Sequence, residues 1–365
     1  MRTRFFQRVR LAAVGLVLTL LLAFGPVSSH AEPLPPIPAF ADSASMPDTT
    51  AVAFRGDVPF PGWTTYALTD ALFWGRDNQA ESRPLLVTVG DEAPLLSASS
   101  LQFPVSEGVR SFYGRRSPDS GGWEIGYFGL YGQSSTRTVA APVGEFLQVP
   151  EPLGGVLTSE ADAAVVRYGS VINSAEANLF STATTWRDRA GGWLTVDWLA
   201  GFRYIGVEEQ SSLTLDACAG DPDCADRVAC RVTSRNNMFG GQVGSRARMT
   251  WNKWAIEGWA KAGLLGNAQK ETQAPLVTSS GAPVPRLSSA TGSEVGFVGD
   301  INLSLVYRLT DVWGIRLGYN TVWISGLALA PDQYDFTLDE RAGGRLNPFG
   351  GIFLHGANLG LEARW

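Results

Sequence analysis

The segment "LTVDWLAGFRY", residues 194–204, alternates between apolar and polar side chains along its length. Successive side chains of an extended chain point to opposite faces, so one face of this segment is apolar throughout. That face collects Leu194, Val196, Trp198, Ala200, Phe202 and Tyr204. The opposite face carries Asp197, Gly201 and Arg203. A strand divided in this way fits a sheet with hydrocarbon on one side and a polar interior on the other.

The same period of two recurs over most of the 365 residues. Ten segments are candidate strands, at 63–76, 109–116, 122–134, 173–187, 192–209, 234–251, 254–270, 294–309, 313–325 and 352–365. We therefore predict an all-β fold of about ten strands, with eight or twelve as the alternatives. Outside the N-terminus, no apolar run reaches the roughly 18 residues that a membrane helix needs, so any later membrane span must be a strand.

The connectors between these segments alternate in length. Short ones lie at 117–122, 188–192, 252–253 and 310–312, and long ones at roughly 77–108, 135–172, 210–233, 271–293 and 326–351. Tight periplasmic turns and long outer loops alternate in this way in transmembrane barrels. The pattern predicts a closed antiparallel up-and-down barrel with both chain ends on the periplasmic side and acidic outer loops.

Aromatic residues on the apolar faces fall into two groups. At the short-turn end they are Trp251, Trp254, Tyr307, Trp313 and Trp365, and near the other end they are Tyr204, Phe239, Phe297, Trp323 and Phe353. Such groups, roughly 25 Å apart, are typical of the two interfacial girdles of a membrane barrel. A soluble β-sandwich is the alternative, but it would place its aromatics in one core.

The N-terminal residues predict export. Residues 1–31 contain four arginines, an apolar stretch from Leu11 to about Val27, and small residues at Ser29 and Ala31, as in a cleaved secretory signal. An uncleaved inner-membrane anchor is the alternative. Residues 32–62 form a proline-rich periplasmic leader, and residues 63–365 the barrel domain. Without residues 1–31, 25 basic residues face 35 acidic ones, a net charge of −10 that excludes nucleic acid as a partner.

Three cysteines, Cys218, Cys224 and Cys230, lie in the polar stretch "DACAGDPDCADRVACRV". Zinc sites favour more closely paired ligands and a fourth one, so a metal site is the weaker reading. We expect one disulfide with one thiol left over, and the spacing does not identify the pair. Among the interleaved aspartates, an EF-hand is excluded because its turn glycine and terminal glutamate are missing.

The predicted inner faces carry ionisable residues, which avoid hydrocarbon there. They are Asp197, Arg203, Arg246, Arg248, Glu257, Lys261, Asp300, Arg308, Arg316, Glu362 and Arg364. Pairing among these mixed charges is one reading, and a narrow polar pore is the other. Beyond the signal only His355 could serve a histidine-dependent mechanism, and its parity places it on the lipid face. We therefore expect no enzyme, no cofactor and no metal site.

Four stretches, "AGFRYIGVEE" (200–209), "RNNMFGGQVGSRARM" (235–249), "LGYNTVWISGLALAPDQYD" (317–335) and "GANLGLEARW" (356–365), carry a family resemblance. Together they resemble the planctomycete outer-membrane β-barrel family known as β-barrel porin type seven, formerly a domain of unknown function. The resemblance extends from about Trp63 to Trp365 and is strongest from residue 192. It implies an outer-membrane barrel without a settled substrate. The terminal Trp365 also looks like the assembly signal read by the outer-membrane insertion machinery.

Two functions fit these expectations. The first is a narrow porin-like channel for small polar solutes, embedded in outer-membrane lipid. The alternative is a non-conducting structural or surface-interaction barrel that displays long acidic loops to a surface partner.

Overall fold

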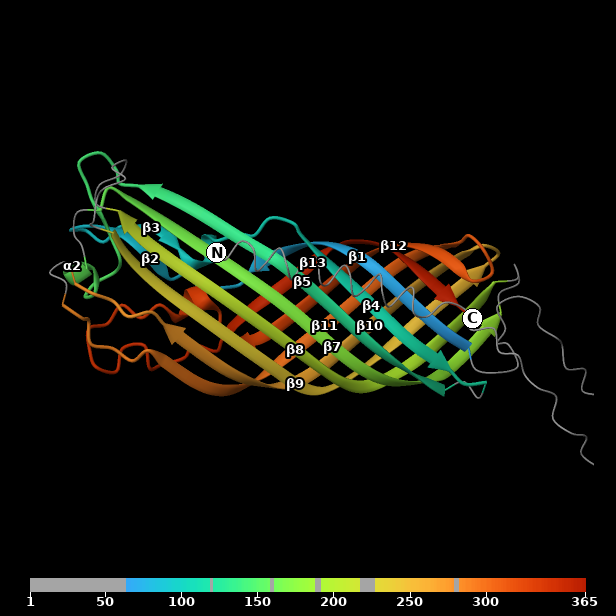
Figure 1. Cartoon of the computed structure of the whole chain (residues 1–365). Helices are drawn as coiled ribbons and strands as arrows, with labels where there is room; N and C mark the ends of the chain where they lie inside the picture. Colours follow the sequence, from blue (N-terminus) through green and yellow to red (C-terminus); the bar gives the residue numbers. More distant parts are fainter. Residues whose placement is uncertain (1–63, 119–120, 158–160, 188–191, 217–226, 279–281) are drawn as a thin grey trace, which may run out of the picture.

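The computed structural model describes residues 64–118, 121–157, 161–187, 192–216, 227–278 and 282–365. Ten antiparallel strands form one closed barrel, in the ring order β1-β13-β12-β11-β10-β9-β8-β7-β5-β4 (Figure 1). Their bounds are β1 Thr64–Asn78, β4 Ser106–Arg116, β5 Gly121–Ala140, β7 Ala163–Arg187, β8 Trp193–Asp216, β9 Arg227–Trp251, β10 Trp254–Gln273, β11 Ser289–Arg308, β12 Trp313–Leu327 and β13 Gly350–Arg364. The predicted barrel and its ten strands are confirmed.

The ring closes where the first strand meets the last. β1 pairs with β13 from Tyr66 opposite Arg364 to Asn78 opposite Ile352. At the end of this ladder, the backbone N–H of Thr65 donates to the carbonyl of Trp365 at 2.7 Å, and the N–H of Trp365 donates back to Thr65 at 3.0 Å. Closure leaves no open sheet edge, which hydrocarbon would not tolerate.

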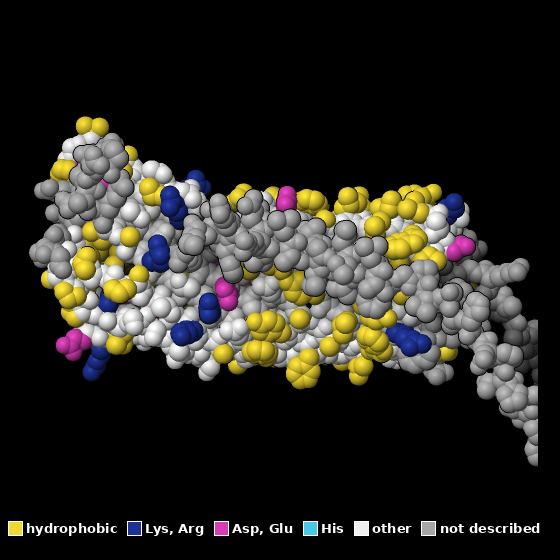
Figure 2. Space-filling model, viewed as in Figure 1, with side chains coloured by type: hydrophobic (Ala, Val, Ile, Leu, Met, Phe, Trp, Pro, Cys, Tyr) yellow, Lys and Arg dark blue, Asp and Glu magenta, His cyan; other side chains and the backbone are white. Residues whose placement is uncertain are grey.

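The outer face of the barrel bears a wide apolar belt, yellow in Figure 2. Along β10 the outward side chains from Trp254 to Ala268 are apolar or glycine, and Lys270 is the first charged one. Exposed belt residues on neighbouring strands include Phe202, Val243, Leu264, Ile301, Leu303 and Leu317. A water-soluble protein would bury these side chains, whereas here they face lipid.

The aromatic residues pack in pairs at the two edges of the belt. At the short-turn edge, the ring centroids of Trp254 and Tyr307 are 4.7 Å apart. At the long-loop edge, Tyr204 lies 4.9 Å from Phe239, and Phe297 lies 6.2 Å from Trp323. These pairs join adjacent strands and lie at the depth where amphipathic rings are favoured.

Several strands are longer than the sequence predicted. The loop predicted at 210–233 is wrong over much of its length, because β8 continues to Asp216 and β9 begins at Arg227. Similarly, β5 continues to Ala140 and β7 begins at Ala163, within the predicted loop 135–172. Above the belt both faces of a strand can be polar, so the alternation that reveals a strand to sequence analysis fades while the backbone ladder continues.

The long connectors contain further structure. β2 Pro84–Thr88 pairs with β3 Pro94–Ser97 and with β6 Leu147–Gln148, which belongs to a different connector. The 3-10 helices η1 Ala98–Ser100 and η2 Ala330–Gln333 and the short helix α2 Gly154–Leu157 complete these segments. They gather at one end of the barrel (Figure 1).

None of the helices in the described part of the chain is long and apolar enough to cross a membrane. The predicted signal (1–31) and leader (32–62) lie outside the described residues, as do Cys218 and Cys224. Cys230 is described and is a buried free thiol.

The position of the belt predicts how charge is tolerated along β10. Ala260 faces outward near the middle of the belt, and Thr272 faces outward beyond it. We expect Ala260→Arg to lower the free energy of unfolding by about 2–4 kcal/mol, as for arginine at a bilayer midplane, and Thr272→Arg to change it by at most about 1 kcal/mol. Urea unfolding in lipid vesicles, followed by tryptophan fluorescence, measures both. Equal effects at the two positions would contradict the placement of the belt.

Candidate functional site in the barrel lumen

The lumen holds every ionisable residue that the sequence assigned to it. Seven of them are no more than 6% exposed, namely Asp197, Arg203, Glu257, Lys261, Asp300, Arg316 and Glu362. The other four, Arg246, Arg248, Arg308 and Arg364, are half-buried and line a vestibule at the short-turn end. Strand parity alone brings these side chains inside, because residues two apart share a face.

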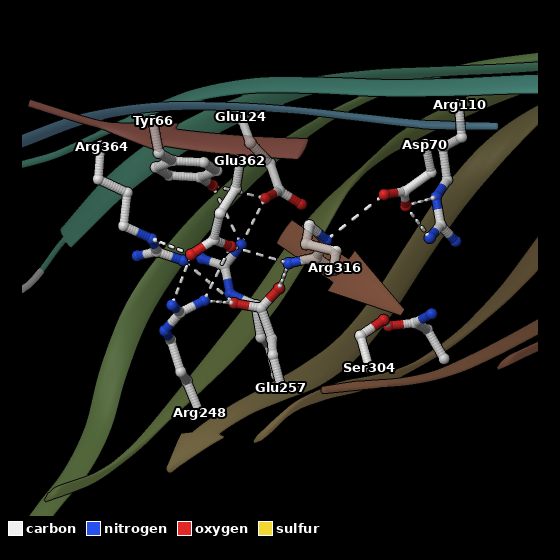
Figure 3. Close-up of polar contacts among 12 residues, drawn as sticks. Tyr66, Asp70, Arg110, Glu124, Arg248, Glu257, Ser304, Arg316, Glu362 and Arg364 are labelled. Atoms are coloured by element: carbon white, nitrogen blue, oxygen red, sulfur yellow. Dashed lines mark hydrogen bonds and ion pairs between the residues drawn. The ribbon is translucent and has the colours of Figure 1, made fainter. Parts of the chain in front are cut away.

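Arg316 on β12 is the centre of a first cluster (Figure 3). Its Nη1 donates to Glu257 Oε1 and to Glu362 Oε2, each at 3.0 Å. Its Nε lies 3.5 Å from Asp70 Oδ1. Arg248 Nη1 donates to Glu257 at 2.8 Å and its Nη2 donates to Glu362 at 2.7 Å. Since Arg316 is fully buried, these carboxylates replace the water that its charge would otherwise require.

A second cluster surrounds Arg246 on β9. Its Nη1 donates to Glu124 Oε2 at 2.7 Å and to the hydroxyl of Tyr66 at 3.0 Å, and its Nη2 lies 3.3 Å from Asp197. Arg116 on β4 approaches the same Asp197 with Nη1 at 3.1 Å. The carboxylate of Asp197 is therefore shared by two guanidinium groups from different walls.

Deeper in the barrel a third cluster joins β7, β8, β10 and β11. Arg203 Nη1 donates to Asp300 Oδ2 at 3.1 Å, and Lys261 Nζ donates to Glu176 Oε1 at 2.5 Å. Trp259 donates its indole N–H to Asp300 Oδ1 at 3.1 Å. Each charge in this layer therefore has an opposite charge within reach, as buried ions require.

Side chains from opposite walls of the barrel meet. β9 and β1 are five places apart in the ring of ten, yet Arg246 bonds directly to Tyr66. β4 and β10 are also five places apart, and the ring centroids of Phe112 and Trp259 are 5.7 Å from one another. The guanidinium carbon of Arg110 lies 4.8 Å from the centroid of the Trp259 ring. The charged layer therefore spans the full width of the lumen.

Sequence reasoning missed six members of this network. The partners that it did not name are Tyr66, Asp70, Arg110, Arg116, Glu124 and Glu176. They lie on β1, β4, β5 and β7. The parity signal was present there: Tyr66 and Asp70 alternate with the outward Ala67, Thr69 and Ala71, but small and threonine side chains make a weak apolar face.

Above the charged layer the lumen becomes apolar. Inward side chains of the strands form this core, including Leu72, Trp74, Phe128, Leu130, Ile172, Ile205, Leu265, Val298, Val322, Ile324 and Leu354, each at most 5% exposed. A buried pair interrupts it: Arg76 Nη2 on β1 donates to Glu209 Oε1 on β8 at 2.6 Å and to the Tyr168 hydroxyl at 2.8 Å. The Phe103 ring lies 4.5 Å from the Arg76 guanidinium.

The connector between β12 and β13 enters the barrel mouth. Asn236 on β9 bonds both backbone groups of Ala328, with its Nδ2 donating to the carbonyl at 2.9 Å and its Oδ1 accepting from the N–H at 2.8 Å. The N–H of Ala330 donates to Glu209 at 2.9 Å, and the Tyr334 hydroxyl donates to Ser211 at 3.0 Å. The connector is thus bound to the wall opposite the strands that it joins.

Two cavities lie at the ends of this filled interior. The short-turn vestibule has a volume of about 380 Å³ and is lined by residues such as Thr64, Arg246 and Glu362. At the long-loop end, a cavity of about 580 Å³ is lined by Arg83, Asp332 and other connector residues. Neither cavity contains a cluster of metal-ligating side chains, since the described residues hold no such group of three.

Asp332, at the long-loop end, is a buried carboxylate with one unsatisfied oxygen. Its Oδ1 accepts from the N–H of Glu81 at 3.0 Å, whereas Oδ2 has no hydrogen-bond partner among the described residues. Burial, opposed by the hydrogen bond from Glu81, raises the pKa of Asp332 to about 7. The carboxyl group of Asp332 therefore changes from its protonated to its ionised form near neutral pH.

His355 lies outside the lumen. Its Nδ1 is 2.8 Å from the Tyr319 hydroxyl, and its ring is 5.5 Å from that of Phe353 on the lipid side. A histidine-dependent mechanism would have to use His355. In the structure this residue instead contacts two aromatic residues, Tyr319 and Phe353, at the outer face of the barrel.

A model of one protein family matches residues 78–365; the family is described as "Putative beta barrel porin-7 (BBP7)". Comparison with curated protein sequences gives no match.

Among solved structures, the outer-membrane protease OmpT from Escherichia coli is similar at 8% identity and a TM-score of 0.46, with 83% of this chain and 97% of that chain covered. The translocator domain of the autotransporter NalP from Neisseria meningitidis is similar at 12% identity and a TM-score of 0.32, with 85% and 90% covered. The attachment invasion locus protein Ail of Yersinia pestis is similar at 8% identity and a TM-score of 0.23, with 84% and 100% covered. At these scores nothing about the function of this chain follows from the likeness.

The charged layer predicts a large effect of removing one buried carboxylate. Glu257→Gln leaves the arginines around it undercompensated, and breaking a buried pair in this way costs about 3–5 kcal/mol of stability. Glu208→Gln is the matched control, because Glu208 pairs with Arg235 at 3.6 Å with both side chains more than half exposed, and such a pair contributes about 0–1 kcal/mol. Urea unfolding in vesicles distinguishes the two. Similar small losses would mean that water, rather than side chains, solvates Glu257.

The raised pKa of Asp332 predicts a pH dependence of the connector. Between the ordinary aspartate pKa of about 3.9 and the folded value of about 7, the folded connector binds more protons than the open one. The contribution of Asp332 to the stability of the closed form is therefore greatest at low pH and is lost as the pH rises through 7. We expect cleavage of 328–349 by an added protease to be faster at pH 8 than at pH 5.5, relative to a model substrate, and Asp332→Asn to reduce this difference. An unchanged pH dependence in Asp332→Asn would contradict the assignment.

Proposed function

The chain belongs to the beta barrel porin-7 family and resides in the outer membrane, and from this premise we propose that it is a closed barrel that holds ordered loops at the cell surface. The observation that carries the proposal is the contact between opposite walls, Arg246 with Tyr66 and Phe112 with Trp259. A barrel of this size has an interior that side chains can nearly fill. A lumen bridged in this way offers no continuous column of water for solutes.

The apolar core and the bound connector add two further barriers in series. Ions crossing the apolar layer would lose most of their hydration, and the charged groups within the layer, Arg76 and Glu209, are already paired with each other. The connector at 328–349 then covers the mouth through its bonds to Asn236 and Glu209. The same bonds fix the position of the connector relative to the membrane. A connector held in one position can present a constant surface to a binding partner. Display of the loops is thus the role that the filled interior favours.

A narrow channel for small polar solutes is the second candidate. The polar vestibule of about 380 Å³ favours it, because the vestibule leads from the short-turn end to the charged layer. Under this alternative, the network of arginines and carboxylates would have to rearrange to admit a solute. Conductance separates the two candidates.

Catalysis is not part of the proposal. The inward carboxylates Glu257, Glu362 and Asp300 are each held by arginine, so none of them is free to serve as a general acid or base. His355 contacts Tyr319 on the outer face, away from every inward carboxylate. We also assign Trp365 the role of a signal to the outer-membrane insertion machinery; its side chain is half-buried, and its backbone pairs with Thr65 at the end of the closing strand.

The proposal predicts electrical silence. Purified, folded protein in a planar bilayer should produce no stepwise conductance at ±100 mV. A variant with residues 330–347 replaced by a Gly-Ser linker should also be silent, because the strand-borne apolar core and the charged layer remain in place. Heat-modifiable migration on gels controls for folding of both proteins. Reproducible unitary steps from the unmodified protein would overturn the proposal in favour of the channel, and steps from the linker variant alone would assign closure to the connector.

A further inference from the structure

Basic side chains lie on the outer face of the barrel just above the apolar belt. Arg167 on β7, Arg231 and Arg235 on β9, and Lys270 on β10 are all exposed, and their strand positions alternate with buried inward residues. Figure 2 shows Lys and Arg side chains gathered immediately beyond the belt, on the side of the long-loop end. We call Arg167, Arg231, Arg235 and Lys270 the outer cation patch.

The patch contains like charges in direct opposition. Arg235 is the register partner of Lys270 across the β9–β10 ladder, and both side chains point outward. Side chains in such positions have their Cβ atoms about 4.5–5.5 Å apart, where two positive charges destabilise the sheet. Glu208 relieves Arg235 only in part, at 3.6 Å and with both side chains more than half exposed. Within the described part of the chain, Lys270, Arg167 and Arg231 form no ion pair.

The other two cations of the patch, Arg167 and Arg231, lie in a second row, four residues farther from the belt than Arg235. Arg167 is the register partner of Ser212 on β8, and Ser212 is the register partner of Arg231 on β9. These two arginines therefore lie about 10 Å apart, two strand spacings across the same face. Four cations, one of them with an acidic neighbour, thus occupy the outward surface of β7, β9 and β10, three of four adjacent strands.

The height of the Arg235–Lys270 pair within the patch matches that of lipid headgroups. On β9 the outward residues above the girdle residue Phe239 are Asn237 and then Arg235. Four residues of a tilted strand rise roughly 10 Å, which places the guanidinium beside the polar layer that adds several ångströms to each side of the hydrocarbon. Long basic side chains also extend toward this layer from nearby positions.

We propose that the outer cation patch binds the phosphorylated headgroup of an outer-leaflet lipid. A phosphate between Arg235 and Lys270 would turn their repulsion into two charge-assisted hydrogen bonds, since a phosphate oxygen accepts from both donors. The lipid chains would lie along the apolar belt directly below, over Leu264 and Phe239. A soluble anion would gain the first interaction without the second, so the position at the belt edge selects a lipid.

The test uses folded full-length protein in nonionic detergent with lipid A as the probe, measured by native mass spectrometry and by the thermal midpoint. Lipid A should bind and raise the midpoint, and zwitterionic phosphatidylcholine should do neither. Arg235→Gln/Lys270→Gln should weaken lipid A binding roughly 25-fold, because a basic residue near a membrane surface contributes about 1 kcal/mol and 1.4 kcal/mol is a factor of ten. The single variant Lys270→Gln should weaken lipid A binding about fivefold, and it serves as the test if the double variant folds poorly.

The matched control is Arg341→Gln/Lys253→Gln, which removes the same charges from exposed positions in the β12–β13 connector and in a short turn. It should bind lipid A like the unmodified protein. Without lipid, Lys270→Gln should melt no lower than the unmodified protein, because it removes a repulsion. Binding within threefold of the unmodified protein by the double variant would overturn the proposal. Equal stabilisation by millimolar inorganic phosphate would overturn it as well, because the site would then be a free-anion site.

Discussion

Hydrocarbon offers no partner to a backbone N–H or C=O group, and this constraint determines how every other part of the molecule is arranged. Each strand must bond to two neighbours, so the first and last strands must meet, as they do between Thr65 and Trp365. Closure at ten strands fixes the diameter of the ring. The strand count therefore also decides how much side-chain volume the lumen can hold. Inward residues fill that volume with contacts from wall to wall.

The interior is filled by two different chemistries in succession. Near the short turns it is filled by charge, with Arg316, Arg246 and Arg203 each facing more than one acceptor from other strands. Nearer the loops it is filled by aliphatic and aromatic side chains such as Trp74 and Leu354. Buried ion pairs add little net stability compared with apolar packing, since desolvation offsets much of their attraction. Their contribution is to fix which strand faces which, because a register slip of one residue would move these charges into lipid.

The sequence was most informative within the membrane belt, where the outer face of each strand must be apolar and charged side chains must point inward. From residue 192 onward most outward residues within the belt are apolar, inward residues such as Glu257 and Arg316 are charged, and the predicted strands 254–270 and 313–325 lie within β10 and β12. Parity also placed Glu257 and Arg316 inside the barrel. It could not predict that they form a pair, because the side chains that meet across a lumen depend on the order of the strands in the ring and on the side-chain rotamers. Above the belt the constraint is relaxed, and the extensions of β8 and β9 were missed. The β2–β6 pairing joins two connectors about sixty residues apart, and nothing local specifies it.

In the upper barrel, β9 has contacts on both of its faces. Inside, Asn236 holds the backbone of Ala328, and on the next outward position of the same strand Arg235 faces the lipid boundary. A strand that is fixed on both faces cannot rotate or slide without breaking one set of contacts, since adjacent residues point in opposite directions. The depth of the barrel in the membrane is therefore coupled to the position of the connector that fills its mouth. In the proposed function, the same residues that close the lumen also hold the loops at a set height above the lipid, so closure and display are two consequences of one packing arrangement.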